Sequence, residues 1–342
     1  MQRRIIATVV AVWLATVAAP LMAGGGPEVD SGMPEEIVIG FQAIPNAEII
    51  AKNLGWHEEA LGIPIRWVQI DSGRDLNTAI AAGGMDLGLG GSSTTVAALA
   101  QGVPGEVFWI YDIIGENEAL VVREDSDIRE VGDLVGRRVA APFGATTHYH
   151  LLAAFEEFGV DPATVEIFDM QPPEMLAAWQ RGDIDAGFVW EPTLAQMLEF
   201  DGRVLISSGE LASRGYVTGD IGLVRTAFAE RYPEVVSTYL ATLHRAVQFY
   251  RTNPDEAAEA VAREFGIEVE EAARQMASLV WVDGEEQLGE EYLGTPGAIG
   301  NLADVFVATG RFLFEQGTIT SAPSRAVFEE AINPQYLQEA LQ

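Results

Sequence analysis

The feature that most constrains the fold of this chain is a unit of strand, Ser/Thr cluster and helix that occurs twice. The first copy spans residues 86–100 within MDLGLGGSSTTVAALAQGVP, and the second spans residues 138–155 within RRVAAPFGATTHYHLLAAF. In each copy an apolar run of strand length leads into hydroxyl side chains and then into an apolar helix. Two such units predict two similar α/β lobes with a site between them.

The hydroxyl clusters, Ser92-Ser93-Thr94-Thr95 and Thr146-Thr147, stand at the predicted helix starts. Ser and Thr at such positions are most often plain N-caps. A helix N-terminus also presents unpaired N–H groups and a partial positive charge, which together can hold an anion. Two such starts facing one cleft are better explained as an oxyanion clamp that needs no Lys or Arg.

The rest of the chain continues the alternation of strands and helices. Strand-like runs are EEIVIGF, IRWVQI and GEVFWIYDII, and DSGRDLNTAIAAGG supplies a helix between the second of them and the first Ser/Thr unit. This order predicts an α/β fold with largely parallel sheets. About 300 residues exceed what one core usually holds, so two lobes are expected.

A weaker sequence repeat, a Gly followed three residues later by an Asp, occurs in both halves of the chain. Gly83 is followed by Asp86, and Gly182 by Asp185, each time between a helix end and a strand. A Gly that ends a helix before a strand is common in α/β chains, so this repeat alone indicates little.

The first 23 residues have the pattern of a secretory signal peptide. Arg3 and Arg4 precede an apolar run that ends in small residues at Ala23, and residues 24–35 follow as a flexible tether. The apolar run is close to the lower limit for a membrane span, so an uncleaved anchor is the alternative. We expect a periplasmic or otherwise exported protein.

Composition excludes several classes of function. The chain has no cysteine, which excludes a disulfide framework, a thiol nucleophile and thiolate metal sites. Its net charge is −31, and removal of the predicted leader makes it −33, with Lys52 the only lysine. Such acidity argues against nucleic acid as a partner, because phosphate binding needs basic patches. We interpret it as adaptation of the surface to a salty medium.

The chain resembles the periplasmic taurine-binding proteins of ABC importers in four stretches: IDSGRDLNTAIAAG, GGSSTTVAALAQGVPGEVFWIYDIIGENEALVV, APFGATTHYHLLAAFEEFGV and MQPPEMLAAWQRGDIDAGFVWEP. The likeness runs from about residue 37 to residue 224 and continues more loosely through the C-terminal part. TTHYHLLAA and QPPEMLAAWQRGDIDA are its most specific parts. Glu191, in the WEP turn, departs from relatives that carry a neutral residue there.

This resemblance implies a two-lobe periplasmic binding protein, type II-like, that closes by a hinge and performs no catalysis. We expect residues 36–118 and 222–342 to form lobe 1 and residues 119–221 to form lobe 2. The crossings should fall near 118–122 and 220–224, with the helical C-terminal segment on lobe 1. The implied partners are an ABC permease and, through it, the ATPase, and the receptor is expected to be a monomer without cofactor or metal.

The resemblance and the charge balance of taurine (2-aminoethanesulfonate) together select the candidate ligand-binding residues. The sulfonate suits Ser92, Ser93, Thr146 and Thr147, with Gln42 as a further donor. The ammonium needs a carboxylate, for which Asp220 is the first choice and Glu118 and Glu191 are alternatives. Trp190 is expected to wall the two-carbon linker. The full set is Gln42, Ser92, Ser93, Glu118, Thr146, Thr147, Trp190 and Asp220.

Three nearby residues are expected to have structural roles. His148 and His150 adjoin the clamp, but the spacing of the four histidines gives no metal-ligand pattern. Trp179 should pack in a helix.

Three other functions remain open. The same fold could bind an alkanesulfonate or a phosphonate zwitterion, and Asp220 discriminates, because a buried carboxylate without a cation is costly. A hydrolase built on Ser93 and His148 would lack the G-x-S-x-G elbow. A pyrimidine-precursor binder or synthase would need more aromatic stacking than this sequence offers.

Overall fold

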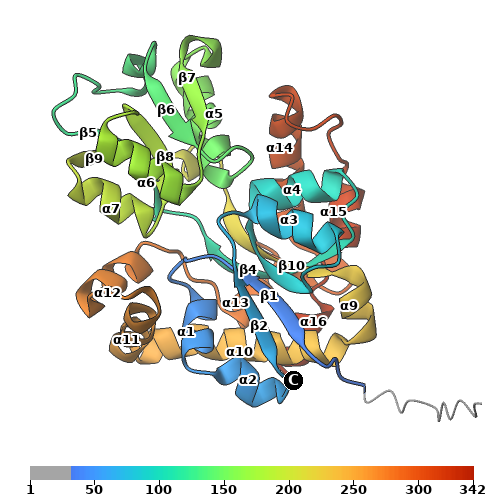
Figure 1. Cartoon of the computed structure of the whole chain (residues 1–342). Coiled ribbons are helices and arrows are strands. Elements are labelled where there is room, and N and C mark those ends of the chain that lie inside the picture. The colour runs from blue at the N-terminus through green and yellow to red at the C-terminus, as the bar shows by residue number, and fades with distance from the viewer. Residues whose placement is uncertain (1–31) are drawn as a thin grey trace, which may run out of the picture. The chain divides into compact units, whose positions relative to one another are not determined.

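The computed structural model describes residues 32–342, and the predicted signal peptide and residues 24–31 of the tether lie outside this range. In the described part, two five-stranded sheets form the centres of two lobes (Figure 1). The first sheet has the order β2 (Ile65–Gln69), β1 (Ile37–Phe41), β3 (Leu87–Gly91), β10 (Gly219–Arg225) and β4 (Gly105–Ile113). The second has the order β7 (Glu166–Asp169), β6 (Arg138–Ala141), β8 (Ala186–Trp190), β5 (Glu118–Arg123) and β9 (Gly202–Ser207).

The two sheets share one topology. In the first, β1 runs parallel to β2 and β3, and β10 runs antiparallel to β3 and β4. In the second, β6 runs parallel to β7 and β8, and β5 runs antiparallel to β8 and β9. The prediction of two similar α/β units is therefore confirmed.

Each sheet is covered by helices from its own part of the chain. The helices of the first lobe are α1 (Ala47–Asn53), α2 (Trp56–Leu61), α3 (Gly73–Ala81) and α4 (Ser92–Ala100). Those of the second lobe are α5 (Thr146–Phe158), α6 (Pro172–Arg181) and α7 (Thr193–Glu199), with the 3-10 turns η1 (Val131–Leu134) and η2 (Pro162–Thr164). Gly159 and Gly182 end α5 and α6 with positive φ, the left-handed conformation that glycine adopts without strain.

The C-terminal segment returns to the first lobe, as predicted. It contains α9 (Thr226–Arg231), α10 (Pro233–Thr252), α11 (Pro254–Phe265), α12 (Val269–Ala277), α13 (Gly284–Gln287), β11 (Gly294–Thr295), β12 (Ala298–Ile299), α14 (Leu302–Glu315), α15 (Arg325–Ala331) and α16 (Gln335–Ala340). Helix α10 packs on α1 and α2, and α14 packs on α4. Pro254 begins α11 and stops α10, because a proline ring disfavours helical backbone at the residue before it.

The chain passes between the sheets twice. Residues 114–117 lead from β4 to β5, and residues 208–218 lead from β9 back to β10 and include α8 (Ser208–Ala212). Residues 219–221, which were predicted to lie in lobe 2, form the start of β10 in the first sheet. They pair there with β3 and β4, long-range partners that the local sequence does not reveal.

The aspartates of the Gly/Asp repeat, Asp86 and Asp185, have the same structural role in the two sheets. Asp86 accepts a hydrogen bond from Val38 N (2.9 Å) at the start of the neighbouring parallel strand, and Asp185 accepts one from Arg138 N (2.9 Å) in the same way. Each carboxylate also pairs with an arginine, Asp86 with Arg225 and Asp185 with Arg138. The repeated residues therefore tie the strands of each sheet together.

No helix among residues 32–342 combines the length and the apolarity that a bilayer span requires.

Candidate functional site

A small cavity lies where the two lobes meet. Its volume is about 10 Å³, room for about one water molecule. The lining residues come from both lobes: Gln42, Ile44, Gly73, Gly91, Thr94, Glu118, Ala145, Thr146, Trp190 and Asp220. None of these described residues is Lys, Arg or His, so the cavity combines two carboxyl groups with neutral donors.

Three helices begin at this cavity, and none of them is capped by a side chain. The N-cap residues of α3, α4 and α5 are Ser72, Gly91 and Ala145, and no side-chain hydrogen bond caps any of the three. The Ser72 hydroxyl is buried without a partner. The first-turn N–H groups of a helix have no partner within the helix, so these donors and the positive helix ends remain available to an anion.

Some helices that begin elsewhere are capped by a side chain, and others, such as α2, α6 and α12, are not. Asn46 accepts a hydrogen bond from Glu48 N at the start of α1, and Ser207 and Asp283 form capping boxes at the starts of α8 and α13. The cavity is therefore distinguished by the convergence of three uncapped starts from both lobes at one place.

Glycines allow the helix starts to approach one another. A Cβ atom on Gly73 would lie 2.4 Å from Thr94 Oγ1, and one on Gly91 would lie 2.7 Å from Thr146 Cγ2. Gly91 belongs to the first lobe and Thr146 to the second. A larger residue at Gly91 would hold the two lobes apart, and one at Gly73 would push α3 away from α4 within the first lobe.

The structure brings only some of the predicted hydroxyl groups to the cavity. Gln42 and Thr146 line it, and the Gln42 amide also donates to Leu89 O (3.2 Å). Ser92 Oγ accepts a hydrogen bond from Gly219 N (3.3 Å), and Ser93 Oγ donates to Gly144 O (2.9 Å) across the lobes. Thr147 Oγ1 is buried without a partner. Ser92, Ser93 and Thr147 are not among the lining residues.

Asp220 and Glu118 are the two carboxyl groups of the cavity. Asp220 lies in β10, in register with Gly91 of β3 on one side and Asp112 of β4 on the other. Burial and the charge of Glu118 raise the pKa of Asp220 to about 8, while contact with Asp112 lowers it. Burial, followed by the charges of Asp220 and Glu118, raises the pKa of Asp112 well above its ordinary value.

Glu118 is held by hydroxyl donors. Thr146 Oγ1 donates to Glu118 Oε1 (2.5 Å) and Ser208 Oγ to Oε2 (3.2 Å). His150 Nδ1 lies 2.7 Å from Ser208 Oγ and 3.6 Å from Oε2, so the ring contacts Glu118 mainly through Ser208. The other ring nitrogen of His150 must donate to Tyr216 O (2.9 Å), since a carbonyl only accepts. His150 thus supports Glu118 from behind the cavity, consistent with the structural role predicted for it.

Trp190 lines the cavity beside Glu118, its partner across β8 and β5, whereas Glu191 does not line it. Glu191 Oε2 instead accepts a hydrogen bond from Ala195 N (2.9 Å) at the start of α7, and its peptide bond to Pro192 is cis. Burial raises the pKa of Glu191 to about 7. The structure therefore places Glu191 as a helix cap.

Two other side chains have local partners. His148 stacks on Phe143 (4.6 Å between ring centroids) and its Nδ1 accepts from Gly144 N (3.3 Å), so Ser93 and His148 both contact Gly144 and not each other. Trp179 is fully buried in α6 and donates to Phe200 O (2.9 Å). Both observations agree with the structural roles predicted for His148 and Trp179.

Sequence reasoning missed several residues at the cavity, namely Ile44, Gly73, Gly91, Thr94, Ala145 and, behind Asp220, Asp112. Thr94 belongs to the quoted Ser/Thr cluster, and Gly73 begins the quoted helix after Ser72. These could have been found by treating every helix start after a strand as a candidate donor. Asp112 lies within an apolar strand and gives no comparable signal.

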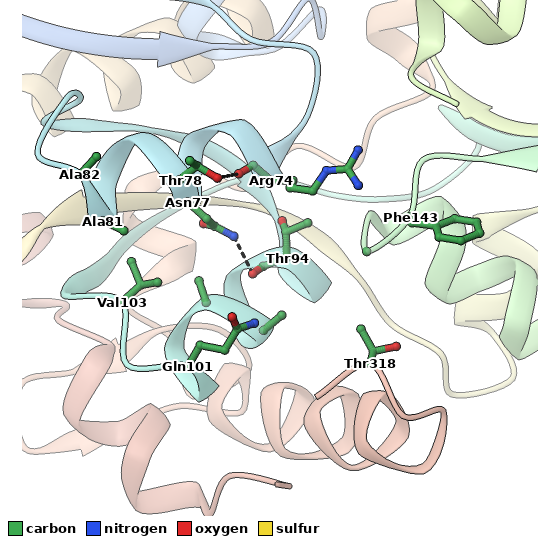
Figure 2. A pocket seen from close by; sticks show the side chains of 13 residues that line it. Arg74, Asn77, Thr78, Ala81, Ala82, Thr94, Gln101, Val103, Phe143 and Thr318 are labelled. Atoms are coloured by element: carbon green, nitrogen blue, oxygen red, sulfur yellow. Dashed lines mark hydrogen bonds between the residues drawn. The ribbon is translucent and has the colours of Figure 1, made fainter. Parts of the chain in front are cut away.

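A second, larger hollow of about 680 Å³ adjoins the first and shares Thr94 with it (Figure 2). It lies over α3 and α4, and Figure 2 shows Phe143 of the second lobe on one side of it. Arg74 of α3 pairs with Asp169 at the end of β7 (3.0 Å), and Asp169 also accepts from Phe143 N (2.8 Å). This ion pair joins the two lobes beside the cavity.

Comparisons of the sequence with a family model and with known proteins point to the same kind of protein. The family model described as NMT1/THI5 like matches residues 46–257. The taurine-binding periplasmic protein of Escherichia coli (strain K12) is 35% identical over 289 residues, which cover 83% of this chain and 87% of that protein.

Solved structures share the fold at lower identity. The alkanesulfonate-binding protein SsuA from Xanthomonas axonopodis pv. citri, bound to MOPS, superposes with a TM-score of 0.73 at 22% identity and covers 88% of this chain and 99% of its own. The desulfurization enzyme DSZB superposes with a TM-score of 0.65 at 16% identity, over 90% of this chain and 99% of its own. Since the fold serves both binding proteins and an enzyme, the site has to distinguish them.

Proposed function

The chain belongs to the NMT1/THI5-like family, among periplasmic solute-binding proteins, and we propose that it captures taurine and delivers it to an ABC importer. The observation that carries the proposal is one cavity in which three uncapped helix starts and a buried aspartate, Asp220, occur together without a basic side chain. A zwitterion needs donors for its anionic end and an acceptor for its cationic end, and this cavity supplies both.

The sulfonate end is assigned to the starts of α3, α4 and α5. Its three oxygens accept from the free first-turn N–H groups, with Gln42 as a side-chain donor. The Thr146 hydroxyl donates to Glu118 in the present structure, so it would have to turn to reach the ligand. Ser92, Ser93 and Thr147 do not line the cavity; Ser93 joins the lobes through Gly144, and Ser92 holds the start of β10 through Gly219 N.

The ammonium end is assigned to Asp220, with Glu118 close enough to raise its pKa. A buried carboxyl that no cation partners is unfavourable when ionised. An ammonium at Asp220 removes this penalty, whereas an alkanesulfonate without an amine does not. This favours taurine over the alkanesulfonate alternative, and Trp190 is assigned to the linker between the two ends.

The lobes must move for the ligand to enter. A cavity of about 10 Å³ is too small for taurine, and the contacts between Ser93 and Gly144 and between Arg74 and Asp169 close it. We infer a hinge at residues 114–117 and 208–218, the two segments that join the sheets. The lobes separate, admit taurine and close around it.

Delivery requires export and partners. We propose that residues 1–23 are a cleaved signal peptide, that the mature receptor acts as a periplasmic monomer, and that an ABC permease and its ATPase accept the ligand from it. The relatives are solute-binding proteins, so the ligand is released unchanged.

A thermal-shift and calorimetric screen tests this function. The panel contains taurine, propane-1-sulfonate, 2-aminoethylphosphonate, propylamine and glycine, so each end of the ligand is removed or replaced in turn. Because a ligand stabilises the folded state by mass action, taurine should raise the Tm most and propylamine least. Equal shifts for taurine and propane-1-sulfonate would instead favour an alkanesulfonate receptor, and turnover of any sulfonate would favour an enzyme.

A further inference from the structure

Asp112 is a buried carboxyl that lies behind the cavity and has no role in the site so far. It belongs to β4, opposite Asp220 of β10, and its side chain is 0% exposed. Among the described residues, no N–H or hydroxyl group donates a hydrogen bond to either Asp112 oxygen. Asp220 is its register partner across β10 and β4, and each of the two carboxyl groups shifts the pKa of the other. Two carboxyl groups can share a hydrogen bond only when one of them carries a proton.

No Lys or Arg of residues 32–342 lines the cavity around this pair. Glu118 of β5 adds a negative charge, and its own partners are Thr146, Ser208 and His150. Tyr111, beside Asp112 on β4, donates to Glu48 of α1 (3.3 Å). The neighbouring strand β3 and helix α4 have the sequences LGLGG and SSTTVAALA, which contain no titratable side chain. The pair is therefore neutralised by protons or by a ligand.

We propose that Asp112 is a positioning residue for Asp220: it stays protonated and donates a hydrogen bond to Asp220, and capture of a ligand ammonium releases the proton that Asp220 carries in the empty cavity. This rests on the proposed function, in which the ammonium contacts Asp220. The only bond that breaks is the O–H bond of Asp220: one cation enters, the Asp220 proton leaves to water, and the proton on Asp112 remains. The lone pairs of the ionised Asp220 then accept from both Asp112 and the ammonium.

Because taurine binding releases a proton, the affinity for taurine should increase as the pH rises. Burial and Glu118 raise the pKa of Asp220 to about 8, so a proton competes with the ammonium below that pH. Taurine affinity should therefore rise with pH up to about 8, by as much as about tenfold per pH unit, and then level off. Propane-1-sulfonate, which does not displace this proton, should show no such rise.

Calorimetry of the full chain measures the release directly. Taurine is titrated at pH 7 in two buffers with different ionisation enthalpies, and the difference in observed heat gives the number of protons released. We expect about one proton per taurine and none for propane-1-sulfonate. Taurine binding with no proton release would overturn the inference.

Two variants of Asp112 test whether this side chain positions Asp220 by a hydrogen bond or only fills space in the core. Asp112→Asn keeps a donor toward Asp220 and should retain wild-type affinity at pH 8. Asp112→Leu removes the donor, so taurine affinity at pH 7 should fall at least tenfold and the pH at which affinity levels off should rise. Identical pH profiles for the Asn and Leu variants would contradict a positioning role. If Asp112→Leu fails to fold, the wild-type proton count still decides.

Glu48→Gln is the matched control, because Glu48 is also a buried acid of the first lobe, held by Tyr111 and Tyr239, but does not line the cavity. It should leave taurine affinity and proton release unchanged.

Failure of the proposed function would give a different result: taurine would not bind the wild type, or Asp220→Asn would weaken the binding of taurine and of propane-1-sulfonate equally. Taurine binding that depends on Asp220 but releases no proton overturns this inference and leaves the proposed function standing.

Discussion

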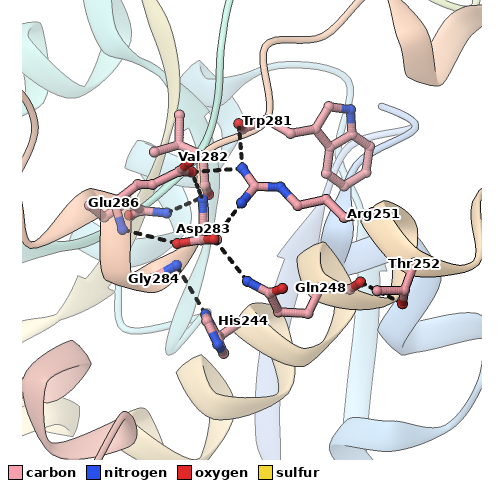
Figure 3. A network of polar contacts seen from close by, with 10 residues as sticks. His244, Gln248, Arg251, Thr252, Trp281, Val282, Asp283, Gly284 and Glu286 are labelled. Atoms are coloured by element: carbon pink, nitrogen blue, oxygen red, sulfur yellow. Dashed lines mark hydrogen bonds and ion pairs between the residues drawn. The ribbon is translucent and has the colours of Figure 1, made fainter.

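Asp283 and Asp220 are both buried aspartates of the first lobe, but their surroundings differ. Asp283 caps α13, where Oδ1 accepts from Glu286 N (2.9 Å) and Oδ2 accepts from Gln248 (2.8 Å) and Arg251 (Figure 3). Asp220 has another carboxyl, Asp112, as its side-chain neighbour and a third, Glu118, close by. Both carboxylate oxygens of Asp283 accept hydrogen bonds, and one of the donors is the cation Arg251. Asp220 instead has two other acidic side chains close to it and no Lys or Arg among the described residues that line the cavity.

On the proposed function, Asp283 is an acid that stabilises the fold and Asp220 is an acid that binds the ligand. A buried carboxylate that is fully hydrogen-bonded and paired stabilises the fold that holds it. A buried cluster of acids lowers stability when ionised, and a fold keeps such a cluster when a ligand neutralises it. The same residue type therefore has opposite consequences for stability at the two positions.

The largest expected effect is on how the stability of the ligand-free protein depends on pH. The folded-state pKa of Asp220 is raised to about 8, so the folded protein holds a proton that the unfolded chain loses near pH 4. Stability therefore falls as pH rises between these values, by up to about 1.4 kcal/mol per pH unit. Asp220→Asn removes this loss, so urea unfolding should find the variant increasingly more stable than the wild type from pH 5 to 8. If the free energies of unfolding of the wild type and the variant changed in parallel with pH, the raised pKa of Asp220 would be contradicted.

The second effect tests the other side of the comparison. Asp283→Asn keeps the shape but removes the charge that partners Arg251, and breaking a buried pair costs about 3 kcal/mol, less where the partner is partly exposed, as Arg251 is. Chemical denaturation at pH 7 should show the loss, while the affinity of the folded variant for taurine stays at the wild-type value. A variant as stable as the wild type would mean that this network contributes little.

The third effect concerns the anion end of the site. The double variant Thr146→Val and Thr147→Val should weaken taurine and propane-1-sulfonate binding alike, by about 0.5–3 kcal/mol, because it removes hydroxyl groups at one helix start. Thr95→Val is the matched control, since Thr95 is a buried threonine of α4 with an unpartnered hydroxyl that does not line the cavity. Unchanged affinity in the double variant would assign these threonines to the fold alone.

The smallest effect concerns the ion pair that joins the lobes. Arg74→Ala should reduce taurine affinity by at most about 1 kcal/mol, and the difference should vanish in high salt, because the pair with Asp169 is exposed. Arg66→Ala is the control: its pair with Glu36 is equally short (3.0 Å) but lies within the first lobe. Titrations at low and high salt should separate the two variants, and equal effects would exclude a role in closure.

The repeated sequence pattern was sufficient to predict the architecture. Strand, hydroxyl cluster and helix at 86–100 and 138–155 correspond to β3 with α4 and to β6 with α5. The pattern is local, so it can be recognised without knowledge of the fold. The start of β10 at Gly219 depends on pairing with β3 and β4, which lie more than a hundred residues earlier, and the predicted lobe boundary is displaced for that reason.

The composition of the site was only partly predictable. Thr146 and Thr147 are adjacent, yet successive residues on a helix point about 100° apart, and only Thr146 lines the cavity. Sequence shows that a helix starts there but not how the helix is rotated against its neighbours. Asp112 was missed for a related reason, because its significance comes entirely from its register with Asp220 across two strands.

The most direct test of a zwitterion site is calorimetry of taurine and propane-1-sulfonate on the wild type and on Asp220→Asn. If Asp220 holds the ammonium, the substitution should weaken taurine binding by roughly 3–5 kcal/mol, several hundredfold or more, since it leaves a buried cation unpaired. Propane-1-sulfonate should bind as well as before or better, because the unpaired carboxyl is gone. Equal losses for both ligands would contradict this account, because Asp220 would then support the fold and Glu118 would be the remaining acid of the cavity.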